Sequence, residues 1–320
     1  MIQVAGLSMR YGPIVALHDA SFRVERGEVV GLLGPNGAGK STTMKILTTY
    51  LYPTGGTASV GGKSILSEPL DVRKRIGYLP EILPLYPDME VRRYLEFVGR
   101  ARGLRTSWLA VRLDWVAQHC GLYTVYRKLI RELSKGYRQR VALAQALIHD
   151  PDVIILDEPT SGLDPHQIRE IRHLIRYLAT EKTILLSTHI LQEVEAIADR
   201  IVIINDGRIV GNGTLSELQR IARRHERVRL VVAASRDEVE DALRRLPQVF
   251  GMRFVSEQNG YCRFEIDGTP SDHFEYDIGA LVHRHAWQVG ELITDLPSLE
   301  ETFLALTEAE PERLRGKMDA

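Results

Sequence analysis

Apolar residues follow two different patterns in the first two thirds of the chain. Continuous apolar runs occupy residues 29–34, 153–158, 183–188 and 200–206, as is typical of strands buried on both faces of a parallel sheet. Between the first two runs, residues 90–148 follow a helical period. Short buried strands that alternate with helical segments predict βαβ units around a parallel core, and therefore an α/β fold.

The last hundred residues alternate strands and helices in another order. We expect a strand, a helix, two strands, a helix and a strand, near residues 228–232, 239–246, 250–256, 261–267, 273–285 and 287–294. This βαββαβ order is that of a small α+β, ferredoxin-like domain. A further helix is expected from Ser298, and residues 311–320 are expected to form a loose tail.

A change of charge marks the boundary between these two regions. Residues 1–220 carry 28 basic and 23 acidic side chains, whereas residues 221–320 carry 13 and 19. The change falls in the basic stretch 221–229, which suits a solvated helix end and a domain junction; contact with anionic lipid is the alternative. We therefore expect one domain over 1–220 and a second over 225–310.

Length and composition limit the class of protein. A chain of 320 residues, 44% hydrophobic and 26% charged, is expected to fold into two domains. Its net charge of −1 does not suit a protein that neutralises a nucleic-acid backbone. The apolar runs are too short to span a membrane and no signal peptide opens the chain. Cys120 and Cys262 form neither a disulfide framework nor a zinc motif, so we expect a soluble cytosolic protein.

A glycine-rich loop between an apolar strand and a helical run fits the phosphate-binding pattern G-x-x-x-x-G-K-[ST]. Glycines allow consecutive N–H groups to turn toward an anion, and the following helix adds its positive end. The lysine supplies a charge to the β- and γ-phosphates, and the serine hydroxyl is placed to bind Mg²⁺. The residues expected to contact a nucleoside triphosphate here are Gly34, Asn36, Gly37, Gly39, Lys40, Ser41 and Thr42.

Two carboxylates end the apolar strand at 153–158, at the edge where open α/β sheets bind ligands. We expect Asp157 to contact the metal, directly or through water. Glu158 would then lie near the attacking water as a general base. The alternative is that the pair only caps the turn before Pro159, but the phosphate loop upstream favours the catalytic interpretation.

Three further motifs complete a family resemblance: Leu133–Arg140 (LSKGYRQR), Ser161–Asp164 (SGLD) and Ser187–His189 (STH). With the phosphate loop and the carboxylate pair, they stand in the order found in ATP-binding subunits of ABC transporters. The chain resembles this family over roughly residues 1–220. The resemblance implies a P-loop NTPase fold with a helical subdomain at about 81–150.

The resemblance also implies roles for single residues. Ser134 and Gly136 would contact the γ-phosphate bound by a partner subunit, and Asp164 would belong to the loop that links the two sites. His189 would touch the γ-phosphate and orient the general base. Tyr11 resembles the aromatic residue that stacks on adenine. Outside this context, a lone strand-end histidine or N-terminal tyrosine is usually structural.

Glu81 departs from the family pattern. The segment Ile76–Glu81 (IGYLPE) aligns with a loop in which most relatives place a glutamine. A carboxylate can still bind Mg²⁺ and accept a hydrogen bond, but it cannot donate one and it adds negative charge beside the phosphates. We expect Glu81 to act in catalysis and metal binding.

The resemblance implies ATP and Mg²⁺ as ligands and a second copy of the chain as partner. Two copies would close head-to-tail around two nucleotides and drive export through separate ABC-2 type permease subunits, at the inner face of the cell membrane and without nucleic acid. Residues 76–81, the LSKGYRQR motif and Leu296–Phe303 are similar to the gliding-motility group of exporters. The alternatives are an ATPase of the same superfamily that acts on ribosomes or DNA, an import ATPase, and a regulatory module that binds a ligand through its C-terminal domain.

Overall fold

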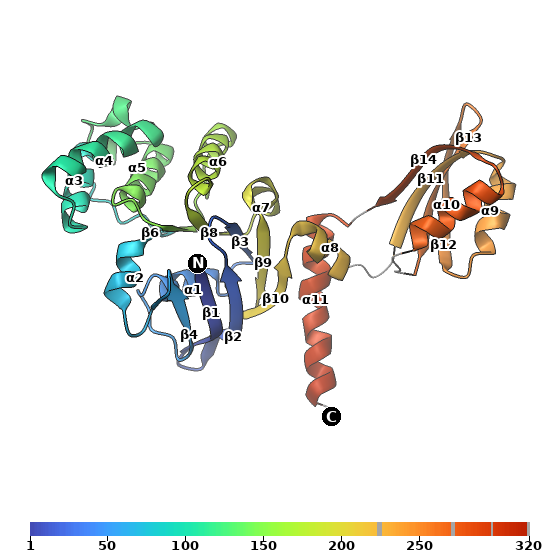
Figure 1. The fold of residues 1–320 in the computed structure, drawn as a ribbon, viewed down its shortest axis with the longest axis horizontal. Coiled ribbons are helices and arrows are strands. Elements are labelled where there is room, and N and C mark those ends of the chain that lie inside the picture. Colours follow the sequence, from blue (N-terminus) through green and yellow to red (C-terminus); the bar gives the residue numbers. More distant parts are fainter. Residues whose placement is uncertain (223–225, 270–272, 296, 319–320) are drawn as a thin grey trace. The chain divides into compact units, whose positions relative to one another are not determined.

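The chain folds as two compact units, Met1–Leu215 and Ser216–Ala320 (Figure 1). The computed structural model describes residues 1–222, 226–269, 273–295 and 297–318, and for 309–318 it describes the backbone alone. Three residues of the basic stretch at 221–229 therefore lie outside the described residues. Among the described helices, none has both the length and the apolar composition needed to cross a bilayer.

The first unit is built on a six-stranded sheet in the order β10-β9-β3-β8-β7-β6. All neighbours are parallel except β9 and β10. The four apolar runs of the sequence are its central strands, and β3, β7 and β8 are buried at every residue, so the predicted parallel core is confirmed. The strands are β3 (Val29–Leu33), β6 (Ile76–Leu79), β7 (Val153–Asp157), β8 (Thr183–Thr188), β9 (Arg200–Asn205) and β10 (Arg208–Gly213).

One face of this sheet packs on an antiparallel sheet and a helix. The second sheet has the order β2-β1-β4-β5. Its apolar residues share one core with α1 and with alternate residues of the central strands, such as Val30, Ile155 and Leu185. These elements are β1 (Ile2–Tyr11), β2 (Ile14–Val24), α1 (Lys40–Leu47), β4 (Gly55–Val60), β5 (Lys63–Ser64) and the nearby α2 (Pro69–Arg75).

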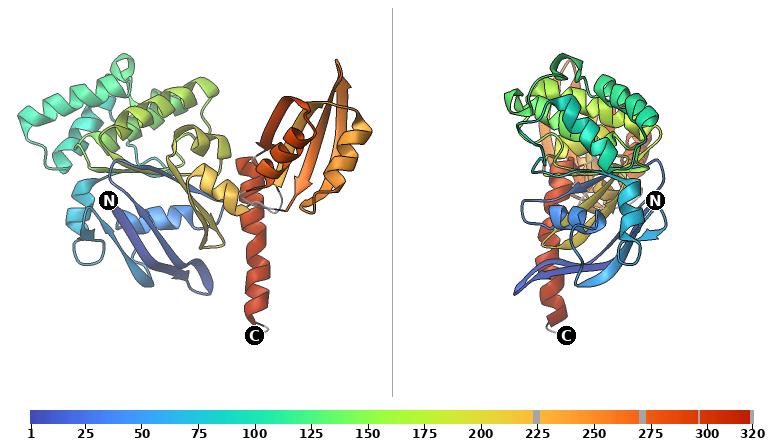
Figure 2. Two further views of the ribbon diagram at one scale, coloured as in Figure 1. Left: turned by 45° about the vertical axis from the view of Figure 1, so that its right-hand side comes forward. Right: turned by 90° about the vertical axis from the view of Figure 1, so that its left-hand side faces the viewer.

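The opposite face of the central sheet packs on helices, as Figure 2 shows. The intervening residues of the same strands, such as Ile154, Leu156 and Leu186, point into this second core. The helices occupy the segment where the sequence predicted them and the two segments that follow β7 and β8. They are α3 (Val91–Ala101), α4 (Thr106–His119), the 3₁₀ turns η1 (Tyr123–Val125) and η2 (Ile130–Glu132), α5 (Lys135–Leu147), α6 (Pro165–Ala179) and α7 (Leu191–Ile197).

The second unit contains an antiparallel sheet in the order β12-β13-β11-β14. Two helices and this sheet enclose a core that includes Leu230, Phe264 and Ile278. The βαββαβ order predicted from the sequence is the one observed. Its elements are β11 (Glu226–Ala233), α9 (Arg236–Arg244), β12 (Val249–Gln258), β13 (Tyr261–Gly268), α10 (Phe274–Arg284) and β14 (Gln288–Asp295).

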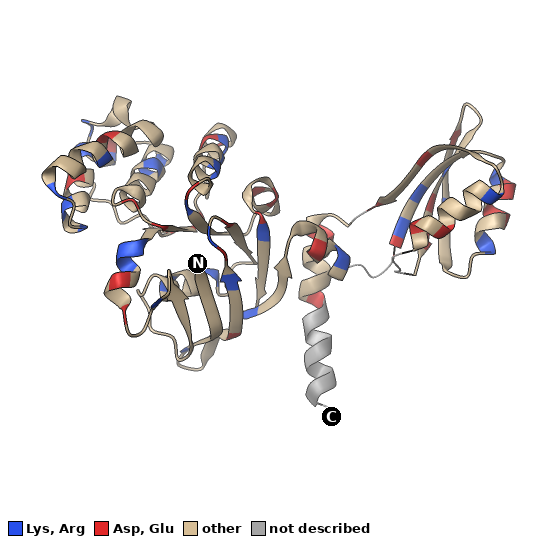
Figure 3. Cartoon of the chain, in the orientation of Figure 1, with Lys and Arg blue, Asp and Glu red and all other residues tan. Residues whose placement is uncertain are grey.

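Both basic and acidic residues lie on the strands of this sheet (Figure 3), and several of them form ion pairs across neighbouring strands. Such partly exposed pairs each contribute little to stability, but they balance basic against acidic groups along the sheet. The shortest contacts are Arg227 with Asp267 (2.7 Å), Arg229 with Asp295 (2.8 Å) and Arg253 with Glu265 (2.7 Å).

Two boundaries of the second unit differ from the expectation. It begins at Ser216 and not after 220, because α8 (Leu215–Ala222) is tied to later residues: Leu218 is fully buried and the Gln219 amide donates to the carbonyl of Pro297. The last helix, α11 (Leu299–Met318), also continues through residues 311–318, which we expected to be loose. Residues 312–315 and 317–318 are good helix formers, whereas Pro311 and Gly316 in the same segment are not. Residues 319–320 lie outside the described chain.

Candidate functional site

The phosphate loop connects β3 to α1 and requires glycine where it enters the helix. Gly39 has φ +106°, and a β-carbon there would lie 2.7 Å from the carbonyl oxygen of Ala16. The next residue, Lys40, is only 6% exposed. Its ammonium donates to the carbonyl oxygens of Gly34 (2.8 Å) and Pro35 (3.1 Å), so the loop backbone holds the charge at the N-terminus of α1.

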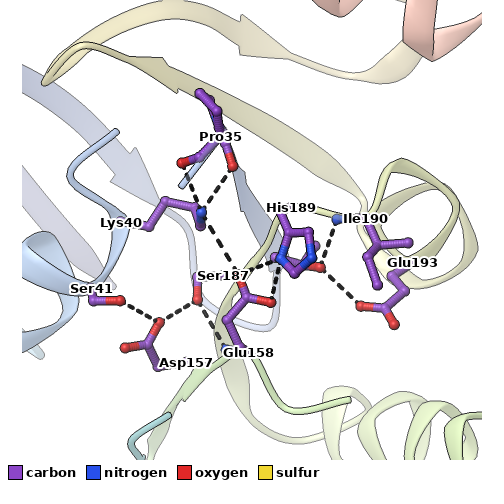
Figure 4. A network of polar contacts seen from close by, with 11 residues as sticks. Pro35, Lys40, Ser41, Asp157, Glu158, Ser187, His189, Ile190 and Glu193 are labelled. Carbon is purple, nitrogen blue, oxygen red and sulfur yellow. Dashed lines mark hydrogen bonds and ion pairs between the residues drawn. The ribbon is translucent and has the colours of Figure 1, made fainter. Parts of the chain in front are cut away.

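Both carboxylates at the end of β7 face this loop (Figure 4). The hydroxyl groups of Ser41 and Ser187 contact Oδ1 of Asp157 at 3.2 and 2.6 Å. Oε1 of Glu158 lies 3.7 Å from the ammonium of Lys40. The side chains of Lys40, Asp157 and Glu158 are all at least nine-tenths buried. The fold therefore brings a cation, two hydroxyl groups and two carboxylates together from α1, the end of β7 and β8.

His189 lies directly after β8 and contacts the carboxylate of Glu158. Its Nδ1 atom is 2.9 and 3.1 Å from the two carboxylate oxygens; an ionised carboxylate only accepts, so Nδ1 must carry the proton. The turn that holds this ring is fixed by Thr188, whose hydroxyl donates to buried Glu193 (2.9 Å) and accepts from the N–H of Ile190 (3.0 Å). The histidine thus reaches the carboxylate from a rigid strand end.

Lys40, Ser41, Glu158 and His189 line a cavity of about 440 Å³, a volume within the usual range of ligand pockets. All but one of its lining residues are candidates from the sequence; the addition is Ser161. The lining residues are Asn36, Gly37, Gly39, Lys40, Ser41, Thr42, Glu81, Glu158, Ser161 and His189.

The other sequence candidates lie elsewhere. Gly34 and Asp157 are not among the described residues that line the cavity, but they contact Lys40 and Ser41, which do. Tyr11, Ser134, Gly136 and Asp164 do not line it either. Ser134 accepts a 3.4 Å hydrogen bond at the N-terminus of α5, and Asp164 caps α6 by accepting from two backbone N–H groups at 3.0 and 2.9 Å. A β-carbon at Gly136 would lie 2.4 Å from the side chain of Gln167, so the LSKG turn packs closely on α6. The contact of Ser134 and Gly136 with a nucleotide bound by a second copy stays a prediction, as do the roles of Tyr11 and Asp164.

The oxygen groups in and beside the cavity suit magnesium more than a transition metal. Ser41, Asp157 and Glu81 offer one hydroxyl and two carboxylates, and Mg²⁺ prefers such ligands together with substrate phosphates. Within the described residues, no three His, Cys, Asp or Glu side chains form a metal-binding group by themselves. The residues therefore fit a metal that arrives with the nucleotide.

Tyr78, on β6, lies next to this charged region and stays neutral. Burial, and then the charges of Asp157 and Glu81, raise the pKa of its hydroxyl well above the usual value. Within the described residues this buried hydroxyl has no hydrogen-bond partner. It therefore adds no further charge to the cavity.

Known proteins resemble this chain in the same region. The family described as "ABC transporter" matches residues 17–161, and a family described as "AAA domain, putative AbiEii toxin, Type IV TA system" matches residues 129–195. The ABC transporter ATP-binding protein NatA of Bacillus subtilis is 39% identical over 207 residues, which are 64% of this chain and 84% of NatA. The chain belongs to the ABC transporter ATP-binding proteins. It is accordingly an ATPase.

Other relatives of this ABC protein extend the comparison. The Nod factor export ATP-binding protein I of Ralstonia nicotianae is 39% identical over 223 residues, 68% of each chain. The uncharacterized ABC transporter ATP-binding protein YxlF of Bacillus subtilis is 32% identical over 309 residues, 97% of this chain and all of YxlF. The similarity to YxlF therefore includes the second unit.

Two solved structures agree with the P-loop fold of the ABC protein. An ATP-binding subunit of an ABC transporter has a TM-score of 0.65 and 33% identity, and covers 77% of this chain and all of the other. A bacterial ABC transporter cassette solved as a dimer has a TM-score of 0.62 and 25% identity, and covers 67% of this chain and 99% of the other. The predicted fold class is confirmed.

Two site residues of this ABC protein were not singled out from the sequence. Ser161 lines the cavity one turn after the carboxylate pair, inside a motif that we noted only for Asp164. Ser187 contacts Asp157 because β7 and β8 are parallel with these two residues in register. The SGLD motif could have indicated Ser161. The role of Ser187 depends on the register of β7 and β8, which the sequence does not reveal.

Proposed function

We propose that two copies of this ABC ATPase close head-to-tail around two Mg·ATP, and that hydrolysis drives export through separate ABC-2 type permease subunits at the inner face of the cell membrane. We propose no nucleic-acid partner. The Nod factor export relative, 39% identical, supports the export direction.

One observation supports the proposal of a dimer. The cavity contains the phosphate loop, the carboxylates and the histidine, yet Ser134 and Gly136 at the N-terminus of α5 do not line it in the described chain. An exposed helix N-terminus is suited to bind a phosphate, so a second copy can supply it to the cavity of the first. The related cassette that was solved as a dimer supports this arrangement.

We assign nucleotide binding to the loop and to the oxygen groups beside it. Lys40 and the N–H groups of the loop hold the β- and γ-phosphates. Ser41, Asp157 and Glu81 would hold Mg²⁺, which would neutralise phosphate charge when bound. Tyr11, 43% exposed at the end of β1, stacks on the adenine.

Glu158 is the proposed general base. Its carboxylate accepts a proton from the attacking water as the water oxygen bonds to the γ-phosphorus. The bond from the γ-phosphorus to the β–γ bridging oxygen breaks in the same step, so phosphate is released and ADP keeps that oxygen. The bond from His189 Nδ1 fixes the direction of the carboxylate, and the ammonium of Lys40 lies 3.7 Å away on the phosphate side. Loss of the γ-phosphate then removes the contacts that favour the closed dimer, so the copies separate.

Glu81 links this chemistry to the helices that would meet the permease. It lines the cavity and lies between β6 and the segment that forms α3, α4 and α5. A change at the phosphates therefore reaches these helices through one short loop. The Asp164 loop, which caps α6 beside the α5 N-terminus, would link the two sites of the dimer.

A substitution of the base tests the proposal. We expect Glu158→Gln to lower the turnover number by about 10²–10⁴-fold, the usual contribution of a general base, while ATP affinity changes little. The matched control is Glu181→Gln, which removes an exposed carboxylate outside the cavity. Steady-state phosphate release and ATP titration are the measurements; near-normal turnover by Glu158→Gln would remove it from this role.

A further inference from the structure

We infer that Ser187 is a positioning residue for ATP hydrolysis: a single buried hydroxyl couples the carboxylate on the metal side, Asp157, to the backbone of the general base, Glu158. The inference rests on the ATPase assignment and on the roles proposed for these two acidic residues. Ser187 itself does not line the cavity among the described residues, so it acts through its neighbours.

The hydroxyl of Ser187 forms two different hydrogen bonds. It donates to Oδ1 of Asp157 at 2.6 Å and accepts from the N–H of Glu158 at 3.1 Å (Figure 4). Ser187 is 0% exposed, so water does not compete for either bond. One donated and one accepted bond use the only proton of the hydroxyl and one of its lone pairs.

Asp157 is held by two hydroxyl groups from different elements. Ser41 on α1 and Ser187 on β8 both contact its Oδ1 atom, at 3.2 and 2.6 Å. Each bond fixes the rotation of the carboxylate, but the shorter one comes from a strand in register with Asp157. Loss of the Ser187 hydroxyl therefore leaves the carboxylate with a single, longer contact and greater rotational freedom.

Glu158 has a backbone conformation that needs support. Its φ of +51° is in the left-handed region, which is unfavourable for residues other than glycine. Its N–H is shared between the hydroxyl of Ser187 (3.1 Å) and the carbonyl oxygen of the same serine (3.2 Å). This strained residue aims the carboxylate toward Lys40 and His189, and Ser187 holds it there.

A purely structural role is the alternative, and the same strand contains a suitable control. Thr183, at the other end of β8, is 1% exposed, and its hydroxyl accepts from the N–H of Gly27 at 3.0 Å. Thr183→Val removes a buried hydroxyl of β8 far from the cavity. If Ser187 only stabilised the strand, Ser187→Ala and Thr183→Val would have the same consequences.

The test uses the full chain and two measurements. Binding of Mn²⁺ is followed by electron paramagnetic resonance in the presence of a non-hydrolysable ATP analogue, and turnover is followed at saturating Mg·ATP. We expect Ser187→Ala to lower Mn²⁺ affinity and the turnover number about tenfold each, since a hydrogen bond to a charged group is lost. Affinity for the analogue without metal should stay within about twofold, because the phosphate loop is unchanged.

Two more variants separate hydrogen bonding from shape. Ser187→Thr keeps the hydroxyl and should recover both quantities to within about threefold, whereas Ser187→Cys keeps the shape with a weak donor and should resemble Ser187→Ala. Thr183→Val should lower the melting temperature without changing either quantity. The inference is overturned if Ser187→Ala has a Mn²⁺ affinity and a turnover number within twofold of the wild type. It is also overturned if a folded Ser187→Thr is no better than Ser187→Ala in these two quantities, or if Thr183→Val lowers them equally.

Failure of this inference is distinguishable from failure of the proposed function. Metal binding beside the phosphate loop is measured on the single chain and does not require the dimer. A normal Ser187→Ala together with an inactive Glu158→Gln would leave the base assignment intact.

Discussion

His149 makes the stability of the first unit depend on pH. It follows α5, and its Nε2 atom lies 3.0 Å from the carbonyl oxygen of Ile76, so Nε2 carries the proton and donates. Within the described residues, its buried Nδ1 atom has no partner. Burial, and then the positive charge of Arg102, lower the pKa of the ring to about 4.

The sign and size of the effect follow from this pKa. The unfolded chain binds a proton at His149 below about pH 6.5, whereas the folded chain does so only near pH 4. The contribution of His149 to the free energy of unfolding is therefore fully present above pH 6.5, and it is lost as the pH falls toward 4. The difference of 2.5 pKa units corresponds to about 3 kcal/mol in total, and to about 2 kcal/mol between pH 7 and pH 5.

Urea unfolding at pH 7 and pH 5 measures this loss. Two of the three tryptophans, Trp108 and Trp115, lie on α4, so a Trp287→Phe background makes fluorescence report the first unit. In this background, His149→Gln keeps a donor for Ile76 but does not titrate, and it should lose about 2 kcal/mol less than the chain with His149.

A matched control removes an exposed imidazole. His173 on α6 is exposed, and His173→Gln should retain the full pH dependence of the wild type. Equal losses of free energy in His149→Gln and in the wild type would refute the reasoning, because the titration would then belong to other groups.

The phosphate loop gives two further predictions. Lys40→Ala should weaken binding of a fluorescent ATP analogue by at least tenfold, whereas Lys45→Ala, on the same helix but outside the cavity, should not; unchanged affinity of the first variant would contradict the assignment. Gly39→Ala should destabilise the chain by more than the roughly 1 kcal/mol expected for Gly103→Ala, since both have positive φ but only Gly39 would place its β-carbon 2.7 Å from a carbonyl oxygen. Thermal unfolding of both glycine variants checks this prediction. Equal shifts of the melting temperature would contradict it, because the backbone would then have moved to avoid the close contact at residue 39.

Much of the fold could be predicted because burial leaves a clear pattern. Strands β3, β7 and β8 are buried on both faces, so their sequences are continuous apolar runs. In the second unit, β11 alternates buried and half-buried residues along its length, which is the pattern of a sheet with one face on a core. The phosphate loop and the carboxylate pair were predictable because they follow such strands directly.

The remainder depends on pairings that leave little trace in the sequence. Strands β1 and β2 were not predicted: their pairing contains register shifts, which interrupt a simple alternation. The contact of Ser187 with Asp157 requires the parallel register of two strands that are 30 residues apart. Likewise, α8 looks like an end of the first domain until the bond from Gln219 to Pro297 places it in the second.

Mixing two inactive variants tests the central claim, that each nucleotide site is shared between two copies. Lys40→Ala removes the phosphate loop lysine, and Ser134→Arg blocks the N-terminus of α5. Each variant carries its defect in both sites of its homodimer, so neither homodimer should have a working site. In an equal mixture, half of the dimers combine both chains and have one intact site, and about a quarter of the wild-type rate of ATP hydrolysis should return. A wild-type rate for Ser134→Arg alone, or a mixture no more active than its parts, would contradict the account.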